Sequence, residues 1–265
     1  MLSAEESIEL AGELAFPAGP GPFPAIVIAH GCAGTGYSDR MWAPLLREWG
    51  YATFIVDSFR PRGYSRICEH TERLQPLERV PDVYGALAAL STNPKIDPQR
   101  IGLMGMSHGG ILTIDAATQW AKDTFLHGGS GFRAFFPIYP YCNITVPELA
   151  SISAPMRIHS GELDDWTPAK PCQEYVESLK VAGQDAAIQV YAQAHHSFDD
   201  PSQQLYYGAN FRTSAKCWWR GASILAPLAL DSPTCVSYGA TVGGNAAAIA
   251  AVKANIRAEL DQLMK

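Results

Sequence analysis

The sequence predicts an α/β fold in which a mainly parallel sheet is covered by helices on both faces. Short apolar, β-branched runs alternate with segments whose apolar residues recur at helical spacing. Alternating strands and helices favour a parallel sheet, because each helix returns the chain to the same end of the sheet. No internal repeat or low-complexity linker interrupts the 265 residues, so we expect one domain over residues 1–265.

The expected elements follow this alternation along most of the chain. Strands are expected at 24–30, 51–57, 100–106, 132–140, 155–160 and 186–194, after an opening strand or hairpin at 7–17. Helices are expected at 39–50, 82–93, 108–121, 168–183 and 245–264, the last with an alanine-rich buried face. The exception is an irregular excursion at about 199–244, a length that is unusual in a compact domain unless it covers a site.

Charge and hydropathy exclude several classes of partner. The net charge of −6 comes from 26 acidic and 20 basic residues without long runs of either sign, which predicts no nucleic-acid partner. No apolar stretch reaches the roughly 18 residues of a membrane span, so no membrane partner is expected. The start, "MLSAEESIEL", lacks the basic and apolar regions of a signal peptide.

Ser107 is the candidate nucleophile. It occupies the centre of a GxSxG motif, Gly105 to Gly109, between an expected strand and an expected helix. At such a position the chain turns sharply and exposes the serine hydroxyl, whereas the alternative is an ordinary glycine-rich turn that opens a helix. His108 is not its base, because adjacent residues point apart at such a turn.

Two backbone N–H groups are candidates for an oxyanion hole. The residue after the nucleophile, His108, supplies one donor, and Cys32 in the earlier segment "HGCAG" is the best second donor. The alternative for that segment is a turn that holds the end of its strand.

A general base and an acid both follow downstream. The segment "GELDDWTP" places Asp164 or Asp165 after one strand, and "AHHSFDD" places a histidine pair after the next. The order serine, aspartate, histidine is that of α/β-hydrolases and differs from the order in chymotrypsin-like or subtilisin-like proteases.

These motifs together resemble the dienelactone hydrolase family of α/β-hydrolases. The resemblance runs through "VIAHGCAG", "GYATFIVDSFRPRG", "RIGLMGMSHGG", "FFPIYPYC", "GELDDWTPAKPC" and "YAQAHHSFDD". The family pattern GxxDxxxP falls on Gly161, Asp164 and Pro168, which implies that Asp164 is the acid. The pattern AxHxF falls on Ala194, His196 and Phe198, which implies that His196 is the base.

The resemblance and the serine together predict an activity. Dienelactone hydrolases proper use a cysteine nucleophile, so Ser107 indicates a serine esterase of the same family. We expect hydrolysis of small-molecule esters, lactones included, through an acyl-enzyme without metal or organic cofactor. The alternatives are a peptidase or amidase on this fold and a catalytically silent binding protein. The oligomeric state is not predicted.

Five residues are candidates for substrate binding. Arg60 and Arg62 follow a strand, and arginines near this site in the resembling family hold substrate carboxylates; the alternative is a structural pairing with Asp57 or Glu69. The aromatic candidates for a pocket wall, which are alternatively core residues, are Tyr141, Trp166 and Phe198.

The connection between Cys142 and Ala154 is too short for a helical cap. We therefore expect an open site, covered only by the excursion that contains Trp218 and Trp219.

Six cysteines are compatible with either an oxidising or a reducing compartment. They lack the close CxxC pairs of zinc sites. Within the excursion, Cys217 and Cys235 bracket the stretch that contains Trp218 and Trp219. The other candidate pairs are Cys142 with Cys172 and Cys32 with Cys68. Three disulfides would favour a periplasmic or secreted enzyme whose signal peptide is missing from this chain, and buried free thiols would favour a cytoplasmic one.

Overall fold

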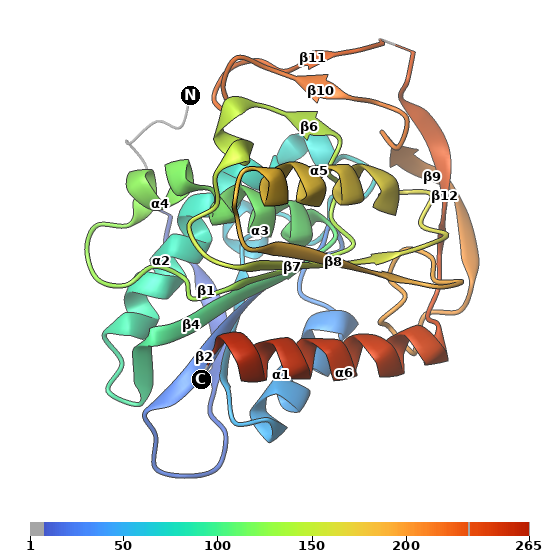
Figure 1. The fold of residues 1–265 in the computed structure, drawn as a ribbon. Helices are drawn as coiled ribbons and strands as arrows, with labels where there is room; N and C mark the ends of the chain where they lie inside the picture. The colour runs from blue at the N-terminus through green and yellow to red at the C-terminus, as the bar shows by residue number, and fades with distance from the viewer. Residues whose placement is uncertain (1–7, 233, 265) are drawn as a thin grey trace.

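A seven-stranded sheet forms the centre of the molecule (Figure 1). The computed structural model describes residues 8–232 and 234–264. The strand order is β1-β3-β2-β4-β5-β7-β8, with β1 antiparallel to β3 and every other neighbouring pair parallel. The strands are β1 (Ala11–Ala15), β2 (Phe23–Ala29), β3 (Ala52–Asp57), β4 (Ile96–Met106), β5 (Phe135–Ile138), β7 (Met156–Gly161) and β8 (Ala186–Tyr191).

Helices cover both faces of this sheet, which confirms the predicted fold class. On one face lie α1 (Tyr37–Glu48) and α6 (Ala246–Leu263); on the other lie α2 (Val80–Ser91), α3 (His108–Ala117), α4 (Gln119–Phe125) and α5 (Ala169–Val181). Short 3-10 turns are η1 (Arg60–Arg62), η2 (Thr71–Arg73), η3 (Pro76–Arg79) and η4 (Pro147–Ala150). The central strand β2 is fully buried over residues 25–29, as expected for a strand covered on both faces.

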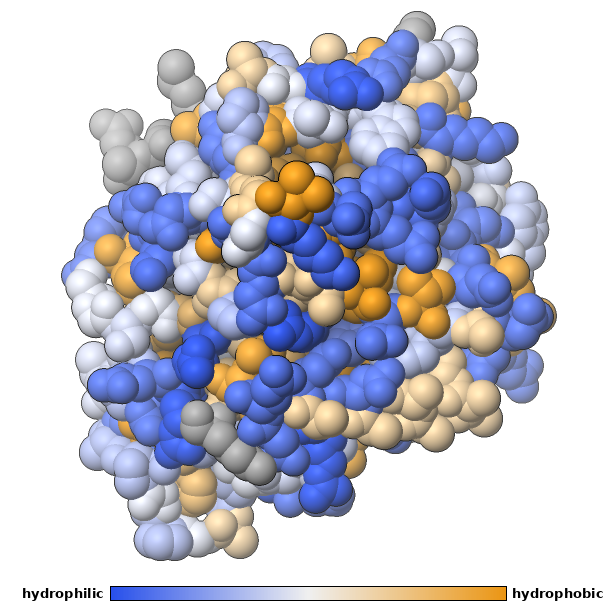
Figure 2. All heavy atoms as spheres, in the orientation of Figure 1, coloured by the Kyte–Doolittle hydropathy of each residue, from blue (hydrophilic) through white to orange (hydrophobic). Residues whose placement is uncertain are grey.

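Two predicted helices differ from the structure. The helix expected at 108–121 is divided at Thr118, whose side chain caps α4 by accepting a hydrogen bond from the backbone N–H of Ala121. The alanine-rich buried face predicted for the last helix is wrong, because α6 buries its larger apolar residues and turns most alanines outward. The buried residues of α6 are Ala248, Val252, Ile256, Leu260 and Leu263, and Figure 2 shows the pale band that its outer surface forms.

The excursion is more regular than predicted. Its longer strands, β9 (Tyr206–Thr213) and β12 (Ser237–Val242), form an antiparallel pair. A short strand, β10 (Trp219–Arg220), lies between β11 (Ala229–Leu230) and β6 (Ile144–Thr145). These strands are short or pair with distant segments, so the sequence carries no tight-turn signal for them.

Three disulfides join all six cysteines: Cys32–Cys68, Cys142–Cys172 and Cys217–Cys235. These are the three pairs that the sequence suggested. The first joins the segment after β2 to the segment after β3, and the second joins the segment after β5 to α5. The third joins two parts of the excursion. Within the described residues, no helix is both long and apolar enough to cross a bilayer.

Thiol counting tests the disulfides. Denatured, unreduced protein is expected to react with no thiol reagent, and reduced protein with six equivalents. Reduction should also lower the Tm, because each bridge restricts the unfolded chain and typically contributes about 2–4 kcal/mol. Six reactive thiols without reduction would contradict the pairing.

Candidate active site

Three polar side chains meet at the carboxyl-terminal edge of the sheet. Ser107 directly follows β4, Asp164 follows β7, and His196 follows β8. Ligand sites of parallel α/β sheets lie at this edge, because successive loops converge there.

The turn that carries Ser107 is strained. Ser107 has φ of 54° and ψ of −115°, a conformation that side-chain-bearing residues rarely adopt. A Cβ at Gly105 would collide with the carbonyl oxygen of Gly109, and a Cβ at Gly109 would collide with that of Ala29. The turn therefore requires glycine at both positions, and it presents the serine side chain at the start of α3.

Hydrogen bonds connect Ser107, His196 and Asp164. The Ser107 hydroxyl lies 2.9 Å from Nε2 of His196, and Nδ1 of His196 lies 2.8 Å from Oδ2 of Asp164. With the imidazole proton on Nδ1 facing the carboxylate, Nε2 is an acceptor for the serine hydroxyl. The histidine and aspartate are buried, so the interaction is shielded from solvent.

The Asp164 carboxylate is fixed by its own loop. Its Oδ1 accepts the backbone N–H groups of Trp166, at 3.0 Å, and Thr167, at 2.7 Å. The Thr167 hydroxyl lies 3.0 Å from both Oδ2 of Asp164 and the carbonyl oxygen of Tyr139. Thr167 was not predicted from the sequence, although its place three residues after an aspartate is a common turn arrangement.

The side chains behind His196 form an aromatic layer. The Tyr139 ring lies 4.7 Å from the His196 ring and 5.6 Å from Phe198, centroid to centroid. Tyr139 and Trp42 both donate to the carboxylate of Asp199, and burial raises the pKa of Asp199. Phe198 is fully buried in this layer and lines neither cavity at Ser107, so its predicted role in the pocket wall is wrong.

A buried arginine joins the two segments predicted to form the oxyanion hole. Arg79 donates from Nη1 to Nδ1 of His108, at 2.7 Å, and from Nη2 to the carbonyl oxygen of His30, at 3.1 Å. Its guanidinium carbon also lies 5.0 Å from the centre of the Phe59 ring. Arg79 is fully buried, and Cys32 and His108 line the cavity beside Ser107. Arg79 was not singled out from the sequence.

The ring of His108 is neutral, and both of its nitrogens take part in hydrogen bonds. Burial, with the charge of Arg79, lowers its pKa to about 3. Nδ1 accepts from Arg79, and Nε2 donates to the carbonyl oxygen of Leu74 at 3.0 Å. Neither nitrogen is free for Ser107, which agrees with the prediction that His108 is not the base.

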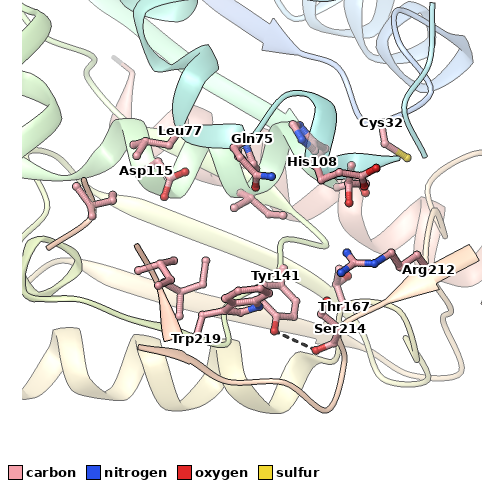
Figure 3. A pocket seen from close by; sticks show the side chains of 18 of the residues that line it. Cys32, Gln75, Leu77, His108, Asp115, Tyr141, Thr167, Arg212, Ser214 and Trp219 are labelled. Atoms are coloured by element: carbon pink, nitrogen blue, oxygen red, sulfur yellow. Dashed lines mark hydrogen bonds between the residues drawn. The ribbon is translucent and has the colours of Figure 1, made fainter. Parts of the chain in front are cut away.

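Two cavities meet at Ser107. The larger has a volume of about 470 Å³ and the smaller about 270 Å³, and both are lined by Cys32, Ser107 and Trp166. Tyr141 and Trp219 line the larger cavity, so the excursion supplies part of its wall (Figure 3). The predicted pocket positions of Tyr141 and Trp166 agree with this arrangement.

The family model described as the dienelactone hydrolase family matches residues 10–228. The chain belongs to the dienelactone hydrolase family. Members of this family hydrolyse ester bonds, and the resemblance inferred from the motifs is confirmed.

The relatives whose names state an activity are distant in sequence. A Bradyrhizobium protein named "Probable 2-oxo-3-(5-oxofuran-2-ylidene)propanoate lactonase" is 21% identical over 73% of this chain and 80% of its own length. Esterase 2 of Thermogutta terrifontis is 19% identical, with a TM-score of 0.58 over 76% of this chain and 85% of its own. A dienelactone hydrolase-like promiscuous phosphotriesterase from metagenomic libraries is 17% identical, with a TM-score of 0.61 over 97% and 93%. These two structures share the fold of this family member.

The two arginines predicted to bind substrate line neither cavity at Ser107. Both Nη atoms of Arg62 donate to Asp82 at 2.8 Å, and Nη1 of Arg60 lies 3.4 Å from Asp57. Both arginines therefore make ion pairs of the kind that the alternative interpretation expected, with Asp82 as an unexpected partner of Arg62. The arginine that lines the larger cavity is Arg212 on β9.

Asp115 gives a pH-dependent stability that can be measured. Burial raises its pKa to about 8, whereas an unfolded aspartate ionises near 3.9. The folded state thus binds the proton more tightly, and the carboxyl destabilises the fold increasingly as pH rises from about 4 to about 8. Asp115→Asn should therefore stabilise the protein more at pH 8 than at pH 5, by over about 1 kcal/mol in unfolding free energy.

Denaturant titration at the two pH values measures this difference. Asp123→Asn, at an exposed residue of α4, is the control and should show the same change in stability at both. Equal effects of Asp115→Asn at pH 5 and pH 8 would contradict the raised pKa.

Proposed function

We propose that this protein is a serine-dependent carboxylic ester hydrolase, active also on lactones, that works through an acyl-enzyme on small substrates. The observation that carries the proposal is the hydrogen-bonded series Ser107, His196 and Asp164. The strained turn at Ser107 presents the serine side chain to the cleft. The lactonase and esterase activities named for the Bradyrhizobium and Thermogutta relatives support it.

Acylation begins with proton transfer from Ser107 to Nε2 of His196 as the serine oxygen attacks the ester carbonyl carbon. Asp164 stabilises the resulting imidazolium through its hydrogen bond to Nδ1. The negative charge on the former carbonyl oxygen is received by the backbone N–H groups of Cys32 and His108. Collapse of this intermediate expels the alcohol, which takes its proton from His196.

Deacylation repeats the sequence with water. His196 accepts a proton from water as the water oxygen attacks the acyl carbon, and then returns a proton to Ser107 as the acid leaves. With a lactone the expelled alcohol stays attached to the acyl group, so one hydroxy acid is released. The two cavities that Ser107 lines provide space for the acyl and alcohol parts of the substrate.

The three disulfides favour action in an oxidising compartment, so we place the enzyme in the periplasm or outside the cell.

Substitutions in the hydrogen-bonded series test the proposed mechanism. Ser107→Ala and His196→Ala should each lower kcat on nitrophenyl butyrate by about 10⁴-fold or more, and Asp164→Asn by about 10⁴-fold because the imidazole tautomer is lost. A fluorophosphonate should label the parent at Ser107. The matched control is His195→Ala, whose ring lies at the surface and contacts the Leu163 carbonyl oxygen.

Two outcomes would reject the proposal. No hydrolysis of esters, lactones or amides, together with no labelling of Ser107, would leave a silent binding protein. Equal loss in His195→Ala and His196→Ala would mean that His196 has no specific role.

Arg79 is expected to act by positioning the oxyanion segments. Arg79→Met leaves the His108 ring and the His30 carbonyl without their donor and removes a positive charge near the developing oxyanion. We expect kcat to fall roughly tenfold or more with little change in KM, because only the transition state carries that charge. Arg79→Lys should recover part of the loss.

The readout is the separate change in kcat and KM, with circular dichroism to establish the fold. Arg100→Met, which removes a partly exposed arginine paired with Asp97, is the control. A loss confined to KM would contradict a positioning role for Arg79.

A further inference from the structure

Asp115 lies on the strip of α3 that faces the substrate cleft. His108, Ile111 and Asp115 are spaced by three and four residues, so they share one face of the helix, and all three line the larger cavity. Asp115 is eight residues beyond Ser107, which places it about 12 Å farther along the helix axis. Figure 3 shows its carboxyl directed into the cavity.

The Asp115 carboxyl has no partner within the described part of the chain. Asp115 is only 6% exposed, yet among the described residues its side chain has no hydrogen-bond donor or charged partner, and burial alone raises its pKa. The nearby Tyr175 hydroxyl is already used, since it donates to the carbonyl oxygen of Leu149 at 3.0 Å. A buried polar group normally has a partner, and one that lacks a partner while facing a cavity can gain one from a ligand.

The surroundings of Asp115 select what that ligand can be. Apolar side chains line much of the same cavity: Leu77, Ile111, Ile144, Trp219, Ile224 and Leu228. The arginine of the cavity, Arg212, lies at the opposite end, beside Thr167 (Figure 3). Hydrocarbon therefore fits the walls, and a hydrogen-bond donor fits the carboxyl.

We propose that Asp115 is a specificity-determining residue that binds a hydrogen-bond donor, a hydroxyl or a protonated amine, at the substrate end remote from the ester bond. This inference rests on the proposed ester hydrolase function. It assigns the substrate a chain that follows the apolar walls from Ser107 to Asp115. Burial raises the pKa of this carboxyl to about 8, which suits both donors. The protonated carboxyl can accept a hydrogen bond from a hydroxyl, and the carboxyl can ionise beside an ammonium.

Three matched acyl groups test the assignment. The substrates are nitrophenyl esters of hexanoate, of its terminal hydroxy derivative and of its terminal amino derivative, with the corresponding octanoate series for reach. We expect the parent enzyme to prefer at least one polar-ended ester, with a kcat/KM about 3- to 10-fold above the plain ester for hydroxyl and about 10- to 100-fold for ammonium.

Two substitutions at Asp115 then separate the donors. Asp115→Leu should abolish the preference for both polar-ended esters while hydrolysis of the plain esters continues. Asp115→Asn keeps a hydrogen-bond acceptor without a charge, so it should retain a hydroxyl preference and lose an ammonium preference. Asp123→Asn is the control and should leave every ratio unchanged.

Stability provides a second measurement. Asp115→Leu should raise the Tm by about 2–4 °C, because an apolar group replaces a buried carboxyl without a partner. Greater stability together with lost selectivity would support a carboxyl that serves the substrate and not the fold.

The outcomes distinguish this inference from the proposed function. If plain and polar-ended esters are hydrolysed with equal kcat/KM and Asp115→Leu changes no ratio, the role of Asp115 is overturned while the ester hydrolase stands. If Asp115→Leu does not fold, Asp115→Asn decides the ammonium arm alone, and an unchanged ratio there overturns that arm. If no ester is hydrolysed and Ser107 is not labelled, both proposals fail.

Discussion

Close approach between backbones is the constraint on which the site depends. Gly105, Gly109 and Gly161 each lie where a Cβ would collide with a carbonyl oxygen of another segment. Gly105 lets the end of β4 approach the start of α3, and Gly109 lets α3 approach the end of β2, so Ser107 lies beside the segment that begins at His30. Gly161 brings the loop of Asp164 against the backbone of Ala194, two residues before the candidate base. The absence of a side chain at these glycines thus allows the segments to approach closely enough for the hydrogen bonds between Ser107, His196 and Asp164 to form.

Two buried ionisable groups near this site lack the carboxylate or donor partners usual in a protein interior. Arg79 makes no ion pair within the described residues, and its Nε has no acceptor there. Burial lowers its pKa to about 10, so it remains a cation at neutral pH, behind the proposed oxyanion hole. Asp115 lies farther along the cleft without a donor. Both groups cost folding free energy. Asp115 lines the cleft, whereas Arg79 lies behind it and contacts the oxyanion segments through His108 and His30.

Much of the fold and the centre of the site could be predicted from local sequence. Alternating periodicity gave the sheet and its helices, and glycine spacing located Ser107, because these signals depend on neighbouring residues. The choice of Asp164 and His196 over their neighbours needed the family pattern. Local sequence did not show that Arg62 pairs with Asp82 or that Phe198 is fully buried, because the direction of a side chain after a strand depends on distant partners. Asp115 also lay beyond reach, since a carboxyl in a helix gives no sign of whether its partner exists.

Hydrogen bonds connect the excursion to the loop that carries the candidate acid, Asp164. Asp165 accepts the backbone N–H and hydroxyl of Thr241 on β12, and Trp166 donates from its indole to the carbonyl oxygen of Arg212 on β9. These residues directly follow Asp164, whose carboxylate is held by the same loop. The loop that orients the candidate acid therefore also carries one wall of the cleft. Trp219 and Arg212 of the excursion line the cavity. A change in the excursion that alters substrate preference must therefore keep the contacts with Asp165 and Trp166, because the same loop orients Asp164.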